Sequence, residues 1–158
     1  MFASAEYRLR AIHTPGHVAN HYCFFEEYSG LLVAGDHIMN GSTVVIVPPS
    51  GDMGAYIRSL QLLLDYDISH IAPAHGDLMN NPIEVVKGLV AHRLGREAKV
   101  VQAMQGLAPT TIEDLVPLVY QDVDVSLYPV AYFSLWAHLR KLEEDSLAAQ
   151  QAKKWQLS

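Results

Sequence analysis

The chain has 158 residues, half of them hydrophobic, and a formal net charge of -6 with histidine neutral. This length suits one domain or two small ones, and the composition supports a buried core. The negative charge argues against a protein that binds nucleic acid through bulk electrostatics. A single cysteine, Cys23, excludes a disulfide framework and favours a reducing compartment. No apolar run approaches the ~20 residues of a membrane span and no signal peptide is evident, so we expect a cytoplasmic protein.

The first half of the chain predicts strands separated by turns and one helix. Runs with strand character lie at residues 7–12, 22–28, 31–34, 43–47 and 70–74. Asp52 is the expected N-cap of a helix that ends near Asp65, because apolar residues recur there at spacings of three and four. The order β-β-β-β-α-β predicts an α/β layered architecture.

The second half predicts helices, at residues 81–104, 110–120 and 126–147. Asn81 and Pro82 are expected to open the first of them. Thr110 and Glu113 form a candidate capping box for the second. The last residues are rich in polar side chains. We therefore expect a layered domain, a helical domain and a polar tail, at residues 1–88, 89–147 and 148–158.

Three side chains that can ligate metals each follow an apolar run and lie beside a glycine. They occur in the segments Thr14-Pro15-Gly16-His17, Gly35-Asp36-His37 and Pro73-Ala74-His75-Gly76. A hydrolytic metal ion needs imidazoles and carboxylates on rigid elements, with one position open for water. His17, Asp36 and His75 are therefore candidate catalytic and metal-binding residues, suited to Zn²⁺, Fe²⁺ or Mn²⁺. The alternative is that they only cap turns.

Other side chains near these motifs are candidates for supporting roles. His21 and His37 are expected either to orient a metal ligand or to face a substrate, and the alternative for His21 is a packed strand histidine. We expect His13 to steady the turn that follows it. Cys23 lies among aromatic residues and is expected to be packed. A nucleophilic Ser42 is disfavoured, because the sequence shows neither a general base nor an oxyanion hole for it.

In their order and context, the three motifs resemble the third, fourth and fifth motifs of the metallo-β-lactamase-fold hydrolases. The resemblance covers about residues 7–145. The helix at residues 52–65 and the His92-Arg93 segment resemble the β-lactamase-like protein 2 branch, which has a C-terminal winged-helix-like domain. The resemblance implies that His17 is a terminal ligand of a first metal ion. It also implies that Asp36 bridges two metal ions and that His75 is a terminal ligand of the second.

The His-x-His-x-Asp-His motif of that family has no counterpart in this chain. The resemblance therefore implies the C-terminal half of an αββα sandwich, truncated and inactive or nearly so alone, with zinc bound weakly or not at all. The intact reaction would be attack of metal-activated water on a small-molecule ester, thioester, amide or phosphodiester. An exposed sheet edge and an apolar face would favour a homo-oligomer.

A second reading of another class stays open, namely a non-catalytic interaction or nucleic-acid-binding module derived from a hydrolase half. The winged-helix resemblance suggests RNA as a ligand. However, acidic residues offset the basic ones of the C-terminal helices, and no basic stripe is seen. A helical domain that packs on the layered domain and lines its cleft is therefore favoured over RNA binding.

Overall fold

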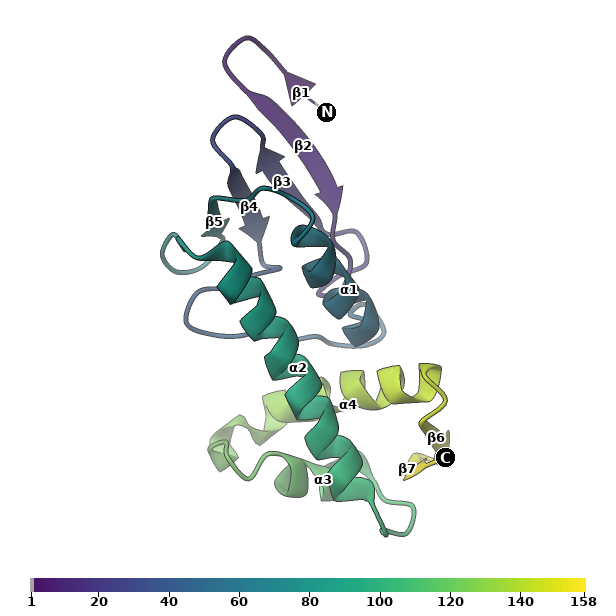
Figure 1. The fold of residues 1–158 in the computed structure, drawn as a ribbon. Helices are drawn as coiled ribbons and strands as arrows, with labels where there is room; N and C mark the ends of the chain where they lie inside the picture. The colour runs from purple at the N-terminus through teal and green to yellow at the C-terminus, as the bar shows by residue number, and fades with distance from the viewer. Residues whose placement is uncertain (1) are drawn as a thin grey trace.

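The computed structural model describes residues 2–158, in which a mixed β-sheet is followed by helices and a C-terminal hairpin (Figure 1). The strands of the sheet are β1 (Phe2–Ala3), β2 (Arg8–His13), β3 (Tyr22–Glu26), β4 (Leu31–Gly35) and β5 (His70–Pro73). They lie in the order β1-β2-β3-β4-β5, antiparallel from β1 to β4 and parallel between β4 and β5. A parallel pair needs a crossover connection, which contains helix α1 (Met53–Leu63).

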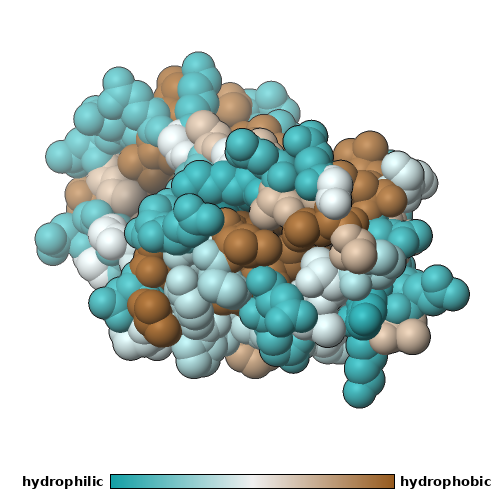
Figure 2. All heavy atoms as spheres, turned by 90° about the horizontal axis from the view of Figure 1, so that it is seen from below, coloured by the Kyte–Doolittle hydropathy of each residue, from teal (hydrophilic) through white to brown (hydrophobic). Residues whose placement is uncertain are grey.

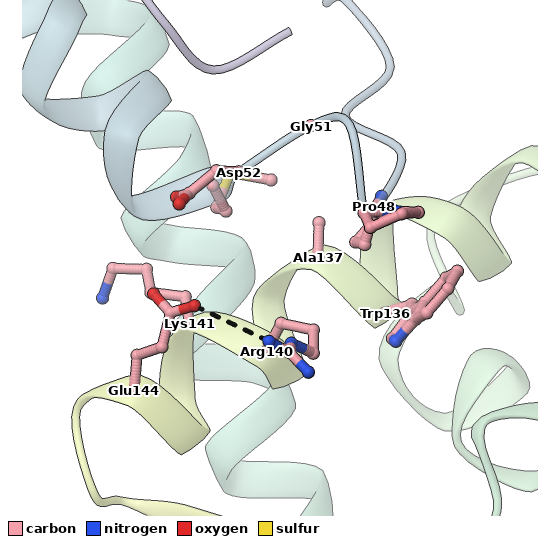
Figure 3. Close-up of a pocket in the computed structure, with 10 residues that line it drawn as sticks. Pro48, Gly51, Asp52, Trp136, Ala137, Arg140, Lys141 and Glu144 are labelled. Atoms are coloured by element: carbon pink, nitrogen blue, oxygen red, sulfur yellow. Dashed lines mark ion pairs between the residues drawn. The ribbon is translucent and has the colours of Figure 1, made fainter. Parts of the chain in front are cut away.

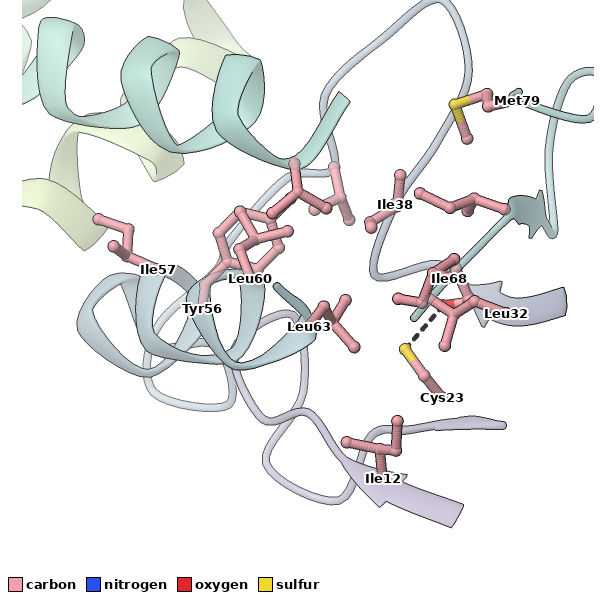
Figure 4. Packing of buried hydrophobic residues seen from close by; sticks show 14 of the residues in the cluster. Ile12, Cys23, Leu32, Ile38, Tyr56, Ile57, Leu60, Leu63, Ile68 and Met79 are labelled. Carbon is pink, nitrogen blue, oxygen red and sulfur yellow. Dashed lines mark hydrogen bonds between the residues drawn. The ribbon is translucent and has the colours of Figure 1, made fainter. Parts of the chain in front are cut away.

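Helix α1 begins where the sequence predicts it. The Asp52 carboxylate accepts a hydrogen bond from the Ala55 N–H at 2.7 Å, which satisfies a donor that the first turn leaves free. The apolar residues of α1 recur on one face and pack with the sheet in a continuous core (Figure 4). The helix residues of this core are Met53, Tyr56, Ile57, Leu60 and Leu63.

The sheet is covered by helices on one face only. Phe25, Leu32 and Ile71 pair in register across three strands, and all are buried in the core beneath the helices. The neighbouring row points the other way, because side chains alternate along strands. Phe24 and Val33 belong to that row, and their exposed fractions are 36% and 43%. An apolar sheet face thus lies open to solvent.

The helices of the second half build another hydrophobic cluster around α2 (Pro82–Met104), α3 (Ile112–Val119) and α4 (Tyr128–Glu144). Helix α2 connects the two parts of the molecule (Figure 1). Its Val86 packs in the sheet core, whereas Val100 and Met104 pack in the second cluster. The expected domain boundary between residues 88 and 89 falls inside this helix. None of the helices within residues 2–158 is long and apolar enough to cross a membrane.

The expected strand at residues 43–47 is wrong, because this segment has no regular structure. Its β-branched residues favour a strand, but its backbone carbonyls accept hydrogen bonds from side chains instead of from a neighbouring strand. The carbonyl of Val44 accepts one from Arg93, and that of Val45 accepts one from His17. A backbone used in this way cannot also join the sheet.

The expected polar tail at residues 148–158 is also wrong. Strands β6 (Ala148–Gln151) and β7 (Lys154–Leu157) form an antiparallel hairpin there. The Trp155 side chain is fully buried in the second cluster, and its backbone bonds that of Thr110 in both directions. The hairpin turn places Ala152 and Lys153 at φ 49° and 66°, without the glycine or asparagine that usually signals such a turn.

Smaller differences concern the ends of elements. The N-cap of α3 is Thr111, whose hydroxyl accepts from the Asp114 N–H, so the expected capping box is displaced by one residue. The expected helix at residues 126–147 begins as a 3-10 turn, η1 (Val125–Leu127), and continues as α4. Strand β1 is too short to leave a sequence pattern.

Replacement of Trp155 tests whether the C-terminal hairpin is part of the fold. We expect Trp155→Ala to lower the free energy of unfolding by about 3–5 kcal/mol, because it leaves a large cavity in the second cluster. Chemical denaturation would measure the change. Gln156→Ala, an exposed position on the same strand, is the matched control and should change stability by less than about 0.5 kcal/mol. Equal effects of the two variants would contradict a structural role for Trp155.

Candidate functional site

The turn that carries His17 follows strand β2 and is fixed against helix α1. Gly16 lies so close to α1 that a Cβ atom there would be 2.4 Å from the Cα of Tyr56. The Gly16 carbonyl accepts a hydrogen bond from the Asp52 N–H at 2.8 Å, and the Pro15 carbonyl accepts one from the Ser59 hydroxyl at 2.7 Å. The glycine of this motif is therefore required by close packing.

The imidazole of His17 has one ring nitrogen committed to the protein. Its Nδ1–H donates to the Val45 carbonyl at 2.9 Å, since a carbonyl can only accept. This bond selects the tautomer whose Nε2 carries a free lone pair. Histidines that ligate metals are commonly oriented by such a bond from their other nitrogen. The irregular backbone of residues 43–47 thus has a specific role beside the candidate ligand.

Asp36 and His75 come together because they follow the adjacent parallel strands β4 and β5. The Ala74 N–H donates to the Gly35 carbonyl at 3.0 Å, which extends the strand pairing to the turns. The His75 Nε2 and the Asp36 Oδ1 lie 3.4 Å apart. That Asp36 oxygen is itself covered and accepts no hydrogen bond from residues 2–158, although the Asp36 and His75 side chains are 46% and 68% exposed. A buried carboxylate oxygen without a donor is suited to a cation, so this pair fits one side of a metal site.

His21 lies close to this pair and is oriented by Thr14. The buried Thr14 hydroxyl donates to the Cys23 Sγ at 3.3 Å and accepts from the His21 Nδ1–H at 2.9 Å. The His21 Nε2 is thereby left as an acceptor. Burial, followed by the charge of His17, lowers the pKa of His21 and keeps the ring neutral. Cys23 is packed, as expected, and burial raises the pKa of its thiol to about 11, so it is protonated.

His37 and His13 lie at opposite extremes of burial. His37 is fully buried, stacks on His21 with ring centroids 5.5 Å apart and contacts the Tyr56 ring. Burial, with the nearby charges of His21 and His17, lowers its pKa to about 3. His13 is exposed, and its Nε2–H donates to the Ala19 carbonyl at 2.9 Å, which braces the turn after β2.

These donors do not form a complete metal shell. Within residues 2–158, no group of three or more histidine, cysteine, aspartate or glutamate side chains is placed to hold a metal ion. Asp36 and His75 are in contact, whereas His17 is bonded to the Val45 carbonyl of the segment 43–47. The metal-ligand roles of all three therefore stay predictions. Sequence reasoning missed the Val45 carbonyl, because every residue has a carbonyl and nothing in a sequence marks the one that orients a histidine.

Comparison with known families gives matches in both halves of the chain. Residues 8–75 match the model of the metallo-beta-lactamase superfamily. Residues 111–155 match the model of the beta-lactamase associated winged helix domain. The second match ends at Trp155, so it includes residues 148–155 of the segment where a polar tail was expected.

Individual relatives match nearly the whole chain. A beta-lactamase-like protein 2 homolog of Drosophila melanogaster is 30% identical over 146 residues, which are 91% of this chain and 48% of that protein. An atrochrysone carboxyl ACP thioesterase of Paecilomyces divaricatus is 30% identical over 155 residues, with 92% and 48% coverage. The chain spans about half the length of these curated relatives.

Solved structures support the fold assignment. The crystal structure of a metallo-beta-lactamase family protein from Thermus thermophilus superposes with a TM-score of 0.82 at 23% identity. The superposition covers 99% of this chain and 52% of the other. A beta-lactamase domain protein from Burkholderia ambifaria superposes with a TM-score of 0.81 at 19% identity. The predicted fold class, a layered α/β half followed by a winged-helix-like domain, is thus confirmed.

Substitution of Gly16 tests the close contact between the His17 turn and α1. We expect Gly16→Ala to destabilise the protein by about 1–3 kcal/mol, because the new methyl group meets backbone that cannot move aside. Thermal or chemical unfolding would measure the loss. Gly88→Ala is the matched control, since nothing lies within 4 Å of its Cβ position in α2, and it should stabilise the protein by about 0.5–1 kcal/mol. A neutral Gly16→Ala would show that the turn is not packed as described.

Proposed function

We propose that this chain, which belongs to the metallo-β-lactamase superfamily, contributes part of the site of a metal-dependent hydrolase. The observation that carries the proposal is the Asp36–His75 pair, whose buried carboxylate oxygen has no donor of its own. His17, with Nδ1 committed to Val45 and Nε2 free, is a third donor. These three residues would hold zinc, or alternatively iron or manganese.

The proposed reaction is hydrolysis of an ester, a thioester or a phosphodiester. A bound metal ion would polarise the scissile bond and lower the pKa of a water molecule. The hydrogen bonds of this chain orient the donor atoms, as the bond from the His17 Nδ1–H to the Val45 carbonyl shows. His21 has a lowered pKa and is oriented through Thr14, so it stays an uncharged neighbour of the ligands. Among the relatives, the thioesterase names favour a thioester as the substrate class.

The proposed site is incomplete within the described residues, because they hold no cluster of three or more ligands. We therefore propose that further ligands come from another polypeptide segment, and that this chain alone binds metal weakly and turns over little substrate.

Zinc binding tests the ligand assignment on the chain by itself. We expect isothermal titration with Zn²⁺ to show weak binding to the unmodified chain. Asp36→Asn and His75→Ala should each weaken it at least about tenfold, because each removes a donor of the pair. His13→Ala is the matched control, since His13 is exposed and bonded to its own turn. Hydrolysis of a model thioester should stay at background in every variant.

Two results would contradict this proposal. Unchanged zinc binding in both Asp36→Asn and His75→Ala would exclude the pair as ligands. Two tightly bound metal ions per chain, with turnover that Asp36→Asn abolishes, would show that the site is complete without another segment.

The open sheet face supports a second proposal, that copies of this chain associate with one another. Phe24 and Val33 present exposed apolar side chains in register on that face. Burial of such a row is favourable, at roughly 25 cal/mol per Å² of apolar surface. The exposed edge of the short strand β1 offers additional backbone groups for pairing.

Analytical ultracentrifugation tests the association. We expect the chain to sediment as a dimer or a larger species and Val33→Lys to shift it toward monomer, because a charge on the open face is costly to bury. Val125→Lys, an exposed position in η1 away from the sheet, is the matched control. A folded monomer over a wide concentration range would exclude the self-association.

A further inference from the structure

Arg93 is a buried positive charge with which no acidic side chain of residues 2–158 forms an ion pair. Its side chain extends from α2, and the residue is only 3% exposed. The guanidinium donates to the Val44 carbonyl and lies 5.2 Å from the centre of the Tyr56 ring. Within residues 2–158 it forms no ion pair, and its Nε has no acceptor. Burial of an ion costs several kcal/mol unless a partner of opposite charge compensates it. An anion bound beside Arg93 would supply that partner.

The ion pairs of the carboxylates on and beside α2 are formed with cations other than Arg93, although the buried Glu97 Oε2 accepts no hydrogen bond from residues 2–158. Glu97, one helical turn further along α2, accepts from Lys141 at 2.9 Å and lies 3.6 Å from the Nδ1 of His138. Asp122 pairs with Arg96 and with Lys99, each at 2.8 Å. Asp122 thus already serves two cations. The region around Arg93 therefore has an excess of positive charge.

A cavity of about 210 Å³ lies beside Arg93, between the segment 43–45, α2 and the start of α4. Arg93 and Arg96 contribute its guanidinium groups, and His92 contributes an imidazole whose pKa is lowered by burial and by the charge of Arg93. Its apolar wall includes Leu127 and Val130, which are also exposed at the surface. No aspartate or glutamate of the described chain lines it. Figure 2 views the helical end of the molecule and shows apolar patches there between hydrophilic side chains.

In a second pocket, the basic residues are paired with acidic residues of the chain (Figure 3). It lies between residues 48–53 and α4, and it too has basic residues in its wall. There, however, Arg140 lies 4.0 Å from the carboxylate of Glu144, and Lys141 bonds Asp145 at 2.6 Å. Its charges are compensated within the chain, so it has no need of an external anion.

We propose that the cavity beside Arg93 binds a small organic carboxylic acid, with the carboxylate directed to the basic wall and the apolar body against Leu127 and Val130. A guanidinium and a carboxylate form charge-assisted hydrogen bonds, which are the stronger kind. The volume is below the about 300–1,000 Å³ of pockets for drug-sized ligands, which favours a small acid. The apolar wall favours a carboxylate with a hydrocarbon body over inorganic phosphate.

The location connects this cavity to the candidate metal ligand. Val44 and Val45 line the cavity, and their carbonyls hold Arg93 and His17 respectively. An acid in the cavity would therefore contact the segment that orients His17. The binding proposal itself does not depend on the proposed hydrolase function, because it concerns residues outside the metal pair and is measured without metal.

The test compares hexanoate with hexanamide, a neutral molecule of nearly the same shape, on the metal-free full chain. We expect hexanoate to raise the melting temperature and to shift amide NMR signals of residues 43–45 and 127–131, and hexanamide to do neither. Val130→Asp places a carboxylate at the cavity wall, so it should weaken hexanoate binding at least tenfold. Arg93→Gln should do the same if it folds.

Val125→Asp is the matched control, because it adds the same charge at an exposed position outside the cavity lining. It should bind hexanoate as the unmodified chain does. Absence of hexanoate binding, equal binding of hexanamide, or equal binding by the Val130→Asp and Val125→Asp variants would each overturn the proposal. Zinc binding by the Asp36–His75 pair can fail or succeed independently of these results.

Discussion

Tyr56 lies where helix α1 meets two of the three turns that carry candidate ligands. Its hydroxyl donates to the His37 carbonyl at 3.0 Å, which supports the turn of Asp36. Its backbone is the surface against which Gly16 packs, and this contact positions the turn of His17. Burial raises the pKa of the Tyr56 hydroxyl, so it remains a donor over the ordinary pH range. The two turns are separate in the sequence, and each contacts this one buried residue, one through its backbone and the other through its hydroxyl.

His17, a candidate ligand, and His21, a neighbour of the ligands, share a pattern of hydrogen bonding. Each of His17 and His21 uses Nδ1 as a donor, to the Val45 carbonyl and to the Thr14 hydroxyl, and keeps Nε2 uncommitted. The Asp36 Oδ1 is buried and also uncommitted. In a metal site, hydrogen bonds hold the ligand side chains in place while the atoms that coordinate the metal stay free. The chain has this arrangement although it does not gather a full set of ligands.

The elements that could be predicted are those in which local signals agree with the tertiary structure. Helix α1 has its cap at Asp52 and a single apolar face, and α2 has Pro82 in its first turn, so both begin where expected. The three motifs could be located because each joins an apolar run to a glycine. Of the three candidate ligands, Asp36 and His75 lie together because they follow the neighbouring strands β4 and β5, and the sequence does not show which strands are neighbours.

The features that escaped prediction depend on partners distant in the sequence. Residues 43–47 look like a strand, but their carbonyls bind the side chains of His17 and Arg93. The final residues look polar, but the Trp155 side chain is buried in the second cluster, against helices that precede it by dozens of residues. Arginine is usually exposed, yet Arg93 is buried. No local pattern distinguishes these cases, because the deciding contact lies in another element.

Helix α2 has a consequence for how the molecule folds. Its 23 residues extend over about 34 Å, at 1.5 Å per residue, and neither hydrophobic cluster protects the whole length. Val86 packs in the first cluster and Val100 packs in the second. Each cluster therefore stabilises a part of α2 on which the other part of the helix depends. Helix α4 is shared in the same way, through Ala137 and Leu139. The layered part and the helical part are therefore expected to unfold in one cooperative transition, as a single thermodynamic unit with two cores.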